Sequence, residues 1–192
     1  MTPNFKTRAI AAIFIASATL SPAIASAKPH KAMSNPTVGG AAMAPKKTIV
    51  QNASAAPNLT TLVAAVKAAG LVETLMSKGP FTVFAPTNTA FEKLPEGTVG
   101  TLIKPENKGT LTTVLTYHVV AGKLAAKDIV MAIKNGGGTA EFTTVAGAKL
   151  SARLSGNSVI LTDAKGGQSA VTTADVFQSN GVVHVIDSVL LP

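Results

Sequence analysis

The second half of the sequence is a series of short strand-like segments separated by glycine-containing turns. Turns of this kind favour antiparallel pairing between neighbouring strands. The dipeptide Asn180-Gly181 predicts a tight turn before Val182–Leu190, which is the most β-like segment of the chain. The strands expected in this half, in chain order, are 141–145, 149–154, 158–162, 169–176 and 182–190.

The first half of the sequence, by contrast, carries apolar residues at helical spacing. Leu59, Leu62 and Val66 follow the three-and-four spacing of one helix. Asn58 would cap this helix, and Gly70 would end it. Because helices come first and strands later, the sequence predicts an α+β fold rather than alternating βαβ units. Further helices are expected over 89–94, 110–115 and 125–134, and short strands over 81–84 and 117–120.

The N-terminus has the pattern of a secretory signal peptide. Lys6 and Arg8 supply positive charge, residues 9–20 are almost wholly apolar, and Ala25-Ser26-Ala27 matches a small-x-small cleavage site. The apolar stretch is shorter than the about 20 residues that cross a bilayer. We therefore expect export with cleavage near Ala27, to the periplasm or outside the cell, with a buried N-terminal helix as the alternative.

The remainder divides into a linker and one domain. Residues 28–45 are rich in Ala, Pro, Gly, Ser and Met, with little periodic pattern, and are expected to form a flexible linker. Residues 46–192 have the length of one domain. After residue 27 no apolar run approaches the length of a membrane span, so no integral membrane segment is expected in the mature chain.

Composition narrows the function classes. The chain has no cysteine, which excludes disulfides, thiolate nucleophiles and cysteine-based zinc sites. Loss of the signal peptide would leave 15 of the 17 Lys and Arg residues against 9 Asp and Glu, a net charge of +6 without a dense cluster. With one Tyr and no Trp, the chain lacks the basic and aromatic stripe of a nucleic-acid-binding protein. Weak attraction to anionic surfaces remains an expectation.

Three segments of the domain resemble the fasciclin domain family. Residues 81–91 (FTVFAPTNTAF) resemble its first signature block, residues 180–192 (NGVVHVIDSVLLP) its closing block, and Tyr117-His118 its Tyr-His motif. The blocks occur in the family's order over the whole domain. The resemblance implies a β-wedge of mostly antiparallel strands, with flanking helices in the N-terminal half. It also implies an extracellular, secreted or periplasmic protein that acts in adhesion or protein interaction.

The Tyr-His motif gives the candidate binding residues. In animal fasciclin domains the resembling dipeptide is linked to receptor adhesion, so the resemblance assigns binding to Tyr117, His118 and Val119. The residues themselves favour a structural pair, because neighbours in a strand point to opposite faces and at least one would be buried. Buried Tyr and His side chains usually find polar partners inside the protein.

The other signature residues are expected to support the fold. His184 has apolar neighbours on its own strand face, which favours a core histidine over a metal ligand or catalytic group. Asp187 would be costly to bury unpaired, so it should accept hydrogen bonds from a nearby hydroxyl or backbone donor. Because the two signature blocks meet in the family fold, the resemblance implies Thr87 or Asn88 as a source. The residues expected to have structural roles are Phe81, Pro86, Thr87, Asn88, Phe91, His184 and Asp187.

No catalytic constellation is present in the sequence. It contains no nucleophile elbow, no H-E-x-x-H motif and no P-loop. We therefore expect no catalytic residue, no metal and no cofactor, and keep a hydrolase only as a residual reading. The first hypothesis is an exported adhesion module that binds a protein or polysaccharide of a cell surface, envelope or matrix. The alternative is an envelope domain that binds a small or lipid-like ligand in a cleft.

Two observations would distinguish these hypotheses. A large apolar pocket with converging polar groups would favour the ligand-binding domain. An exposed apolar patch beside Tyr117-His118 would favour the adhesion module.

Overall fold

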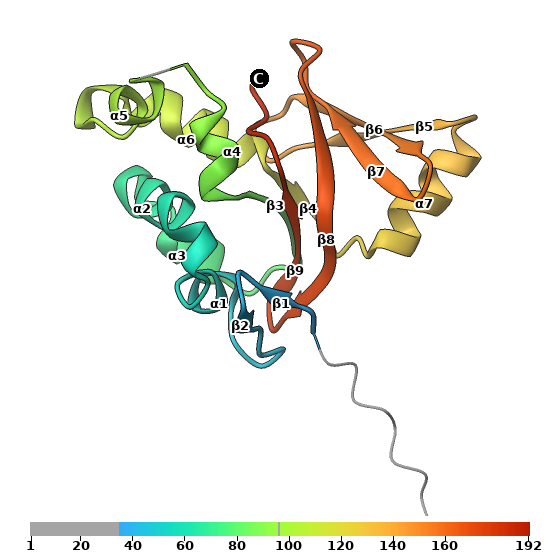
Figure 1. The fold of residues 1–192 in the computed structure, drawn as a ribbon, viewed down its shortest axis with the longest axis horizontal. Helices are drawn as coiled ribbons and strands as arrows, with labels where there is room; N and C mark the ends of the chain where they lie inside the picture. The colour runs from blue at the N-terminus through green and yellow to red at the C-terminus, as the bar shows by residue number, and fades with distance from the viewer. Residues whose placement is uncertain (1–34, 96) are drawn as a thin grey trace, which may run out of the picture. The chain divides into compact units, whose positions relative to one another are not determined.

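The computed structural model describes residues 35–95 and 97–192 (Figure 1). The helices are α1 (Ile49–Ala53), α2 (Thr60–Ala69), α3 (Val72–Met76), α4 (Asn88–Glu92), α5 (Thr98–Leu102), α6 (Lys108–Tyr117) and α7 (Ala126–Asn135), with 3-10 turns at Pro57–Leu59 and Pro105–Asn107. The strands are β1 (Thr37–Val38), β2 (Ala41–Ala42), β3 (Phe81–Pro86), β4 (Val119–Ala121), β5 (Thr139–Thr143), β6 (Lys149–Ser155), β7 (Ser158–Thr162), β8 (Gln168–Gln178) and β9 (Gly181–Ile186).

The main sheet has the strand order β4-β3-β9-β8-β7-β6-β5. Strands β3 and β9 pair in parallel, and the other neighbours pair antiparallel. An isolated bridge between Val120 and Thr144 links β4 to the residue after β5, so the two ends of the sheet nearly meet. Most of the helices precede the C-terminal strands (Figure 1), which confirms the predicted α+β wedge.

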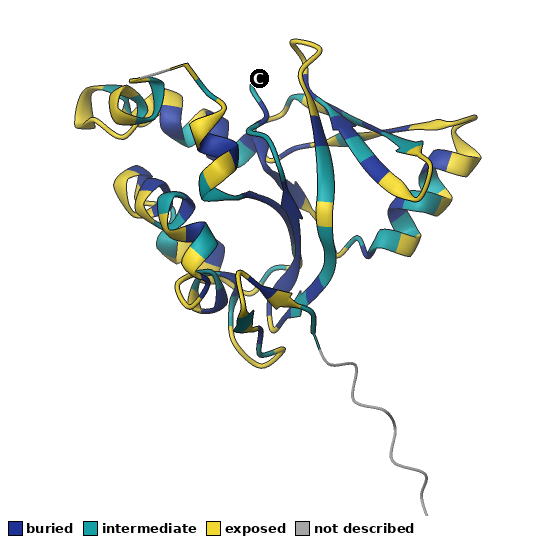
Figure 2. Ribbon diagram, viewed as in Figure 1, coloured by how far each residue is buried: buried dark blue, intermediate teal, exposed yellow. Residues whose placement is uncertain are grey.

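Strands β3 and β9 lie between two hydrophobic cores. Figure 2 shows both strands as buried along most of their length. Val83 and Val183 face the core formed with the N-terminal helices. Phe84 and Ile186 face the second core, which includes residues of α7 and of β5, β6 and β7. Both faces of β3 are therefore buried, because successive side chains of a strand point to opposite faces and each face meets a different core.

The ends of two helices differ in part from the sequence expectation. Gly70 ends α2 in the left-handed conformation, at φ 73°, as expected. Asn58 does not cap α2, because a 3-10 turn precedes the helix and Leu59 is its N-cap. In α4 the cap is Thr87 rather than Thr89, and the Thr87 hydroxyl accepts a hydrogen bond from the Ala90 N–H at 3.2 Å.

The described part of the expected linker packs against the domain. Strands β1 and β2 form a hairpin across Gly39 and Gly40, which have φ angles of 58° and 81°. Val38 and Met43 are buried in the core of the N-terminal helices. The Gly-Gly pair supplies the positive φ angles that a two-residue hairpin turn requires. The overall composition of the segment does not indicate strands, and for that reason the sequence predicts a linker there. Residues 28–34 and the expected signal peptide lie outside the described residues.

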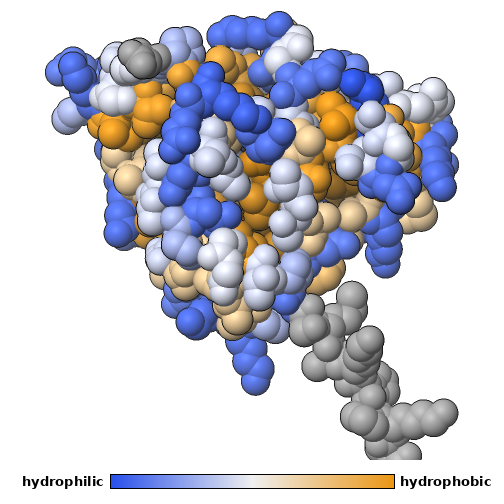
Figure 3. All heavy atoms as spheres, viewed as in Figure 1, coloured by the Kyte–Doolittle hydropathy of each residue, from blue (hydrophilic) through white to orange (hydrophobic). Residues whose placement is uncertain are grey.

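Hydrophobic residues are visible in the middle of the face shown in Figure 3, and hydrophilic residues cover much of its outer edge. Within the described ranges, none of the helices combines the length and the apolar character needed to cross a bilayer.

Candidate functional site

Tyr117 is the last residue of α6, and its side chain is fully buried. The hydroxyl group donates a hydrogen bond to the Lys149 carbonyl at 2.7 Å and accepts one from the Ala164 N–H at 3.0 Å. Burial raises the pKa of Tyr117 above its usual value, and the hydrogen bond from Ala164 partly opposes this shift. The hydroxyl group thus connects the end of α6 to β6 and to the turn after β7.

His118 caps the C-terminus of α6 and is 2% exposed. Its Nε2 lies 3.0 Å from the backbone N–H of Leu190, which can only donate, so Nε2 accepts. Nδ1 then carries the proton and donates to the Val114 carbonyl at 2.8 Å. Burial lowers the pKa of His118 to about 4, and the bond to Val114 opposes this shift only in part. The ring is therefore neutral at physiological pH.

The expected strand at Tyr117-His118 is a helix end instead, and β4 begins only at Val119. Tyr117 and His118 follow Val114 by three and four residues, which places them on the buried face of α6. Val119 is also buried, at 5% exposure. Its carbonyl accepts a hydrogen bond at 2.7 Å from Val145, which is 47% exposed. Direct contact of the three candidate residues with a partner stays a prediction.

His184 is fully buried on β9 and stacks against Phe84, with ring centroids 5.7 Å apart. Its Nε2 donates to the Leu124 carbonyl at 2.8 Å, and its Nδ1 accepts from the Asp175 N–H at 3.3 Å. Burial lowers the pKa of His184, so this ring is also neutral. Both ring nitrogens are engaged inside the protein, which leaves neither free to coordinate a metal ion.

Asp187 follows β9 and accepts several hydrogen bonds. Its carboxylate binds the Ala170 N–H at 2.8 Å and the Ser169 hydroxyl at 3.2 Å, and it pairs with Lys93 at 3.4 Å. Burial alone would raise the pKa of Asp187, but the bond from Ala170 and the charge of Lys93 outweigh it and lower the pKa. The donors come from β8 and from Lys93 just after α4, and not from Thr87 or Asn88, because β8 is the antiparallel neighbour of β9.

The remaining signature residues contact other parts of the fold. The Asn88 side chain accepts from the Thr61 N–H at 3.0 Å and donates to the Thr60 hydroxyl at 2.9 Å, which joins α4 to α2. Phe91 packs in the core of the N-terminal helices, and Phe81 packs against that core. Pro86 is the last residue of β3 and pairs with Ile186.

Asn180 has a structural role that sequence reasoning missed. Its Oδ1 accepts from the Ile49 N–H at 3.1 Å, and its Nδ2 donates to the carbonyls of Leu75 and Ser77 at 2.7 and 3.1 Å. Its own carbonyl accepts from the Phe81 N–H at 3.1 Å. The turn preference of Asn-Gly is visible in the sequence, but nothing local indicates contacts about 100 residues away.

The cavities of the described domain are small inside and larger at the surface. An apolar cavity of about 30 Å³ lies between α1, α2, β3 and α6 and reaches His118. A surface cleft of about 380 Å³ lies where α1 and β9 begin and α3 and β8 end. Across residues 35–95 and 97–192, no cluster of three His, Asp or Glu side chains is arranged to hold a metal ion.

These features define an α+β domain built on a nearly closed β-wedge. The rings of His118 and His184 are buried in it and hydrogen-bonded to backbone groups. The fasciclin domain model matches residues 57–192. The chain therefore belongs to the fasciclin domain family.

Relatives of known sequence agree with this assignment. Protein sll1483 from Synechocystis sp. is 44% identical over 171 residues, which cover 89% of this chain and 88% of the relative. Immunogenic protein MPB70 from Mycobacterium bovis is 42% identical over 145 residues, covering 73% of this chain and 66% of that protein. Human periostin is 33% identical over 135 residues, and the match spans 70% of this chain but only 15% of periostin.

A solved structure shares the fold. The chain matches the FAS1 domain pair of the insect cell adhesion molecule fasciclin I with a TM-score of 0.68 and 18% sequence identity. The match covers 76% of this chain and 51% of that chain.

Proposed function

We propose that this protein is an exported, non-catalytic adhesion module that binds a protein or a polysaccharide at a cell surface, in the envelope or in the matrix. Membership of the fasciclin domain family carries the proposal. The likeness in fold to a domain pair from a cell adhesion molecule supports it.

The hydrogen bonds that the buried polar side chains make inside the domain also support a non-catalytic role. General acid–base catalysis needs a titratable group within reach of a substrate. Both ring nitrogens of His118 and of His184 are engaged with backbone groups, and both rings are buried. The Tyr117 hydroxyl likewise has its partners inside the domain. We propose that these residues support the fold and that exposed residues contact the partner.

The alternative, a pocket for a small or lipid-like ligand, has less support. Sites for such ligands usually measure about 300 Å³ or more and are largely apolar. The apolar cavity beside His118 measures about 30 Å³, which is closer to the room needed by one or two water molecules. The larger surface cleft, of about 380 Å³, is lined in large part by Lys, Thr, Ser and amide side chains, so it is not the largely apolar pocket that the alternative requires.

The test is which partner the immobilised protein retains from intact cells and from envelope fractions. The purified protein is immobilised, incubated with both and cross-linked, beside an unrelated basic protein of similar size and similar pI. We expect this protein to retain a distinct protein or polysaccharide that the control does not. Equal retention on the two matrices would contradict the proposal, and a co-purified lipid without any retained partner would favour the alternative.

Export is tested separately. The mature N-terminus is sequenced from protein recovered outside the cytoplasm, and we expect it to begin at Lys28. Full-length protein found only in the cytoplasm would contradict export.

A further inference from the structure

The cleft of about 380 Å³ lies at the end of the wedge where β8 turns into β9. Four segments line it: Thr48 before α1, residues 76–80 from the last residue of α3 onward, Lys123 after β4, and residues 178–181 from the end of β8 to the start of β9. These segments are far apart in sequence, and the fold brings them together near β1 and β2 (Figure 1). Its volume lies within the range of ligand-binding clefts.

The charged groups of the cleft are all positive. Lys78 and Lys123 are exposed, and none of the described residues that line the cleft is acidic. The described ion pairs of the domain involve other lysines, at positions 93 and 149. The Lys123 ammonium group lies 5.0 Å from the centre of the Phe177 ring, a cation–π contact that holds it at the rim.

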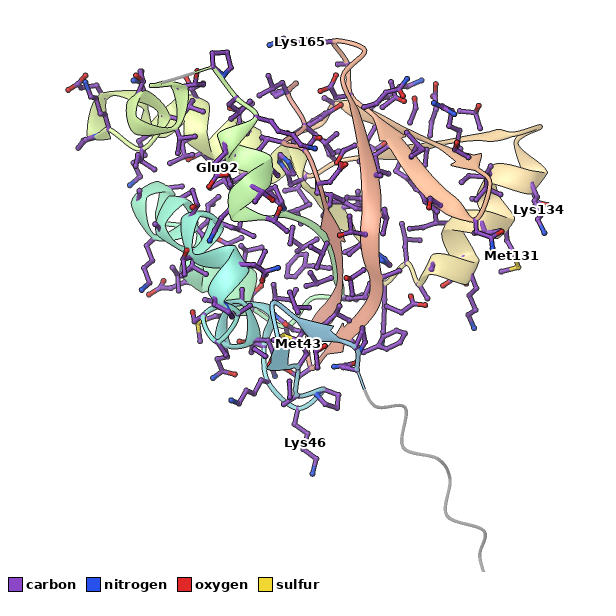
Figure 4. All side chains as sticks on the ribbon, in the orientation of Figure 1. Met43, Lys46, Glu92, Met131, Lys134 and Lys165 are labelled. Carbon is purple, nitrogen blue, oxygen red and sulfur yellow. The ribbon has the colours of Figure 1, made fainter. Side chains whose placement is uncertain are left out.

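Further lysines approach the same end of the molecule. The Lys47 carbonyl accepts a hydrogen bond from the Ser179 N–H at 3.0 Å, which holds the segment before α1 against the β8–β9 turn. In Figure 4 the side chain of Lys46 extends away from the domain at this end. The cleft therefore lies in a region of positive potential that attracts anions.

The floor of the cleft is held in place by buried contacts. Asn180 binds the start of α1 and the end of α3 through its side chain. Gly79 and Gly181 have no room for a side chain, because a Cβ atom would lie 2.2 Å from the Asn180 carbonyl oxygen and 2.0 Å from the Phe81 carbonyl oxygen, respectively. A floor fixed in this way holds the backbone positions from which Lys78 and Lys123 extend, which lowers part of the entropic cost of binding.

We propose that this cleft binds an anionic polysaccharide through the carboxylate groups of its sugars. This inference rests on the proposed function and names a ligand class and a site for it. The hydroxyls of Thr48, Ser77 and Ser179 line the cleft beside the two lysines. The Ser77 hydroxyl donates to the Thr74 carbonyl, which leaves the Ser77 oxygen to accept from a sugar hydroxyl. The Thr48 oxygen accepts from the Gln51 N–H, which leaves the Thr48 hydroxyl to donate to a sugar hydroxyl. Met76 and Pro80 offer a small apolar surface for the carbon face of a sugar ring. An acidic protein fits less well, because protein interfaces usually have an apolar and aromatic centre.

The test uses two double variants with the same change in net charge. Lys78→Gln/Lys123→Gln removes the charges of the cleft. Lys134→Gln/Lys165→Gln removes two exposed charges from α7 and from the β7–β8 turn, which lie away from this end (Figure 4). Because all four side chains are exposed, both variants should fold, and their melting temperatures check this.

Binding is measured by calorimetry and by NMR shifts with oligogalacturonate, a chain of carboxylated sugars, at low and moderate salt. Neutral maltooligosaccharide and polyglutamate of equal length are the comparison ligands. We expect oligogalacturonate to bind best, to shift the signals of Ser77 and Ser179, and to weaken as salt rises. Lys78→Gln/Lys123→Gln should lose about tenfold in affinity, and the control variant less than twofold.

Equal losses in the two double variants would overturn the proposal, because they would indicate general charge attraction. Tighter binding of polyglutamate would overturn it in favour of an acidic protein, and absent binding of oligogalacturonate would overturn it outright.

The experiment with intact cells and envelope fractions separates this inference from the proposed function. If immobilised wild-type protein and immobilised Lys78→Gln/Lys123→Gln retain the same partner equally, the cleft is excluded as the binding site for that partner and the adhesion role stands. If the protein binds oligogalacturonate in the cleft but retains no partner from cells or envelope fractions, the cleft stands and the adhesion role falls.

Discussion

The backbone N–H of Leu190 donates a hydrogen bond to Nε2 of His118, at 3.0 Å, and ties the segment after β9 to the end of α6. A proton on Nε2 would abolish this bond, because a protonated imidazole has no acceptor. The contact therefore exists only while the His118 ring is neutral, and the stability of the fold depends on pH through it.

We predict that the protein loses stability between pH 6.5 and about 4. His118 is buried, and its pKa falls from the usual 6.5 to about 4. In that range the unfolded chain binds a proton that the folded chain excludes, so the free energy of unfolding decreases as the pH falls. His118 alone accounts for about 3 kcal/mol across this range, and His184 acts in the same direction. Urea unfolding at half-unit pH steps would measure the slope, and a flat profile from pH 7 to pH 4 would contradict this account.

The variant His118→Leu isolates the contribution of this one ring. It leaves the buried N–H of Leu190 without an acceptor, which should cost about 1–3 kcal/mol at pH 7. It also removes one titrating group, so its stability should fall less steeply between pH 6.5 and 4 than that of the wild type. The free energy of unfolding at pH 7 and its slope between pH 6.5 and 4 both come from the same urea series. A variant that keeps the wild-type slope would show that His118 does not cause the acid sensitivity.

Gly181→Ala should destabilise the protein by about 3 kcal/mol, the upper end of the usual cost of overpacking. The new Cβ would lie 2.0 Å from the backbone carbonyl oxygen of Phe81 on the parallel neighbour strand, where no flexible side chain can move aside. The matched control is Gly109→Ala in α6, where nothing lies within 4 Å. That change should stabilise the helix by up to about 1 kcal/mol. Equal effects of the two changes in thermal unfolding would contradict the close approach of β9 to β3.

The case of Gly181 shows what the sequence could and could not predict. The dipeptide Asn180-Gly181 predicts a tight turn, and it does lie where β8 passes into β9. Yet Gly181 does not have a positive φ angle, and its lack of a side chain serves the parallel contact with Phe81. That strand pairs with β9 from 100 residues away, and no local pattern indicates such a pairing.

The Tyr-His motif is a second place where the sequence alone does not predict the local structure. The residues from Tyr117 to Val120 have strand composition, but the helical face that includes Val114 continues through Tyr117. Short apolar segments are ambiguous between helix and strand, and here the buried contacts of α6 decide the outcome. Strand β3 carries apolar residues on both of its faces, Val83 on one and Phe84 on the other, and each face is buried in a different core.

Asp187→Ala should lower the free energy of unfolding by about 1–2 kcal/mol, because the N–H of Ala170 and the hydroxyl of Ser169 lose a charged acceptor. The cost stays moderate, because the carboxylate side chain is 40% exposed and water can replace part of its bonds. In a domain of this size the loss corresponds to a fall of about 3–8 °C in melting temperature. Scanning calorimetry at pH 7 measures it.

Two further variants separate the hydrogen bonds of Asp187 from its ion pair. Lys93→Gln removes the ammonium group, whose side chain is 55% exposed, together with its contacts to Asp187 and to the Ser188 hydroxyl, and should cost about 0.5 kcal/mol or less. Asp187→Asn keeps an oxygen that can accept from Ala170, so it should lie between Lys93→Gln and Asp187→Ala. Because the pKa of Asp187 is lowered in the folded state, its contribution should persist from neutral pH down to its ordinary pKa and disappear only below it. If Lys93→Gln matched Asp187→Ala, the ion pair and not the contact with β8 would be what holds the end of β9.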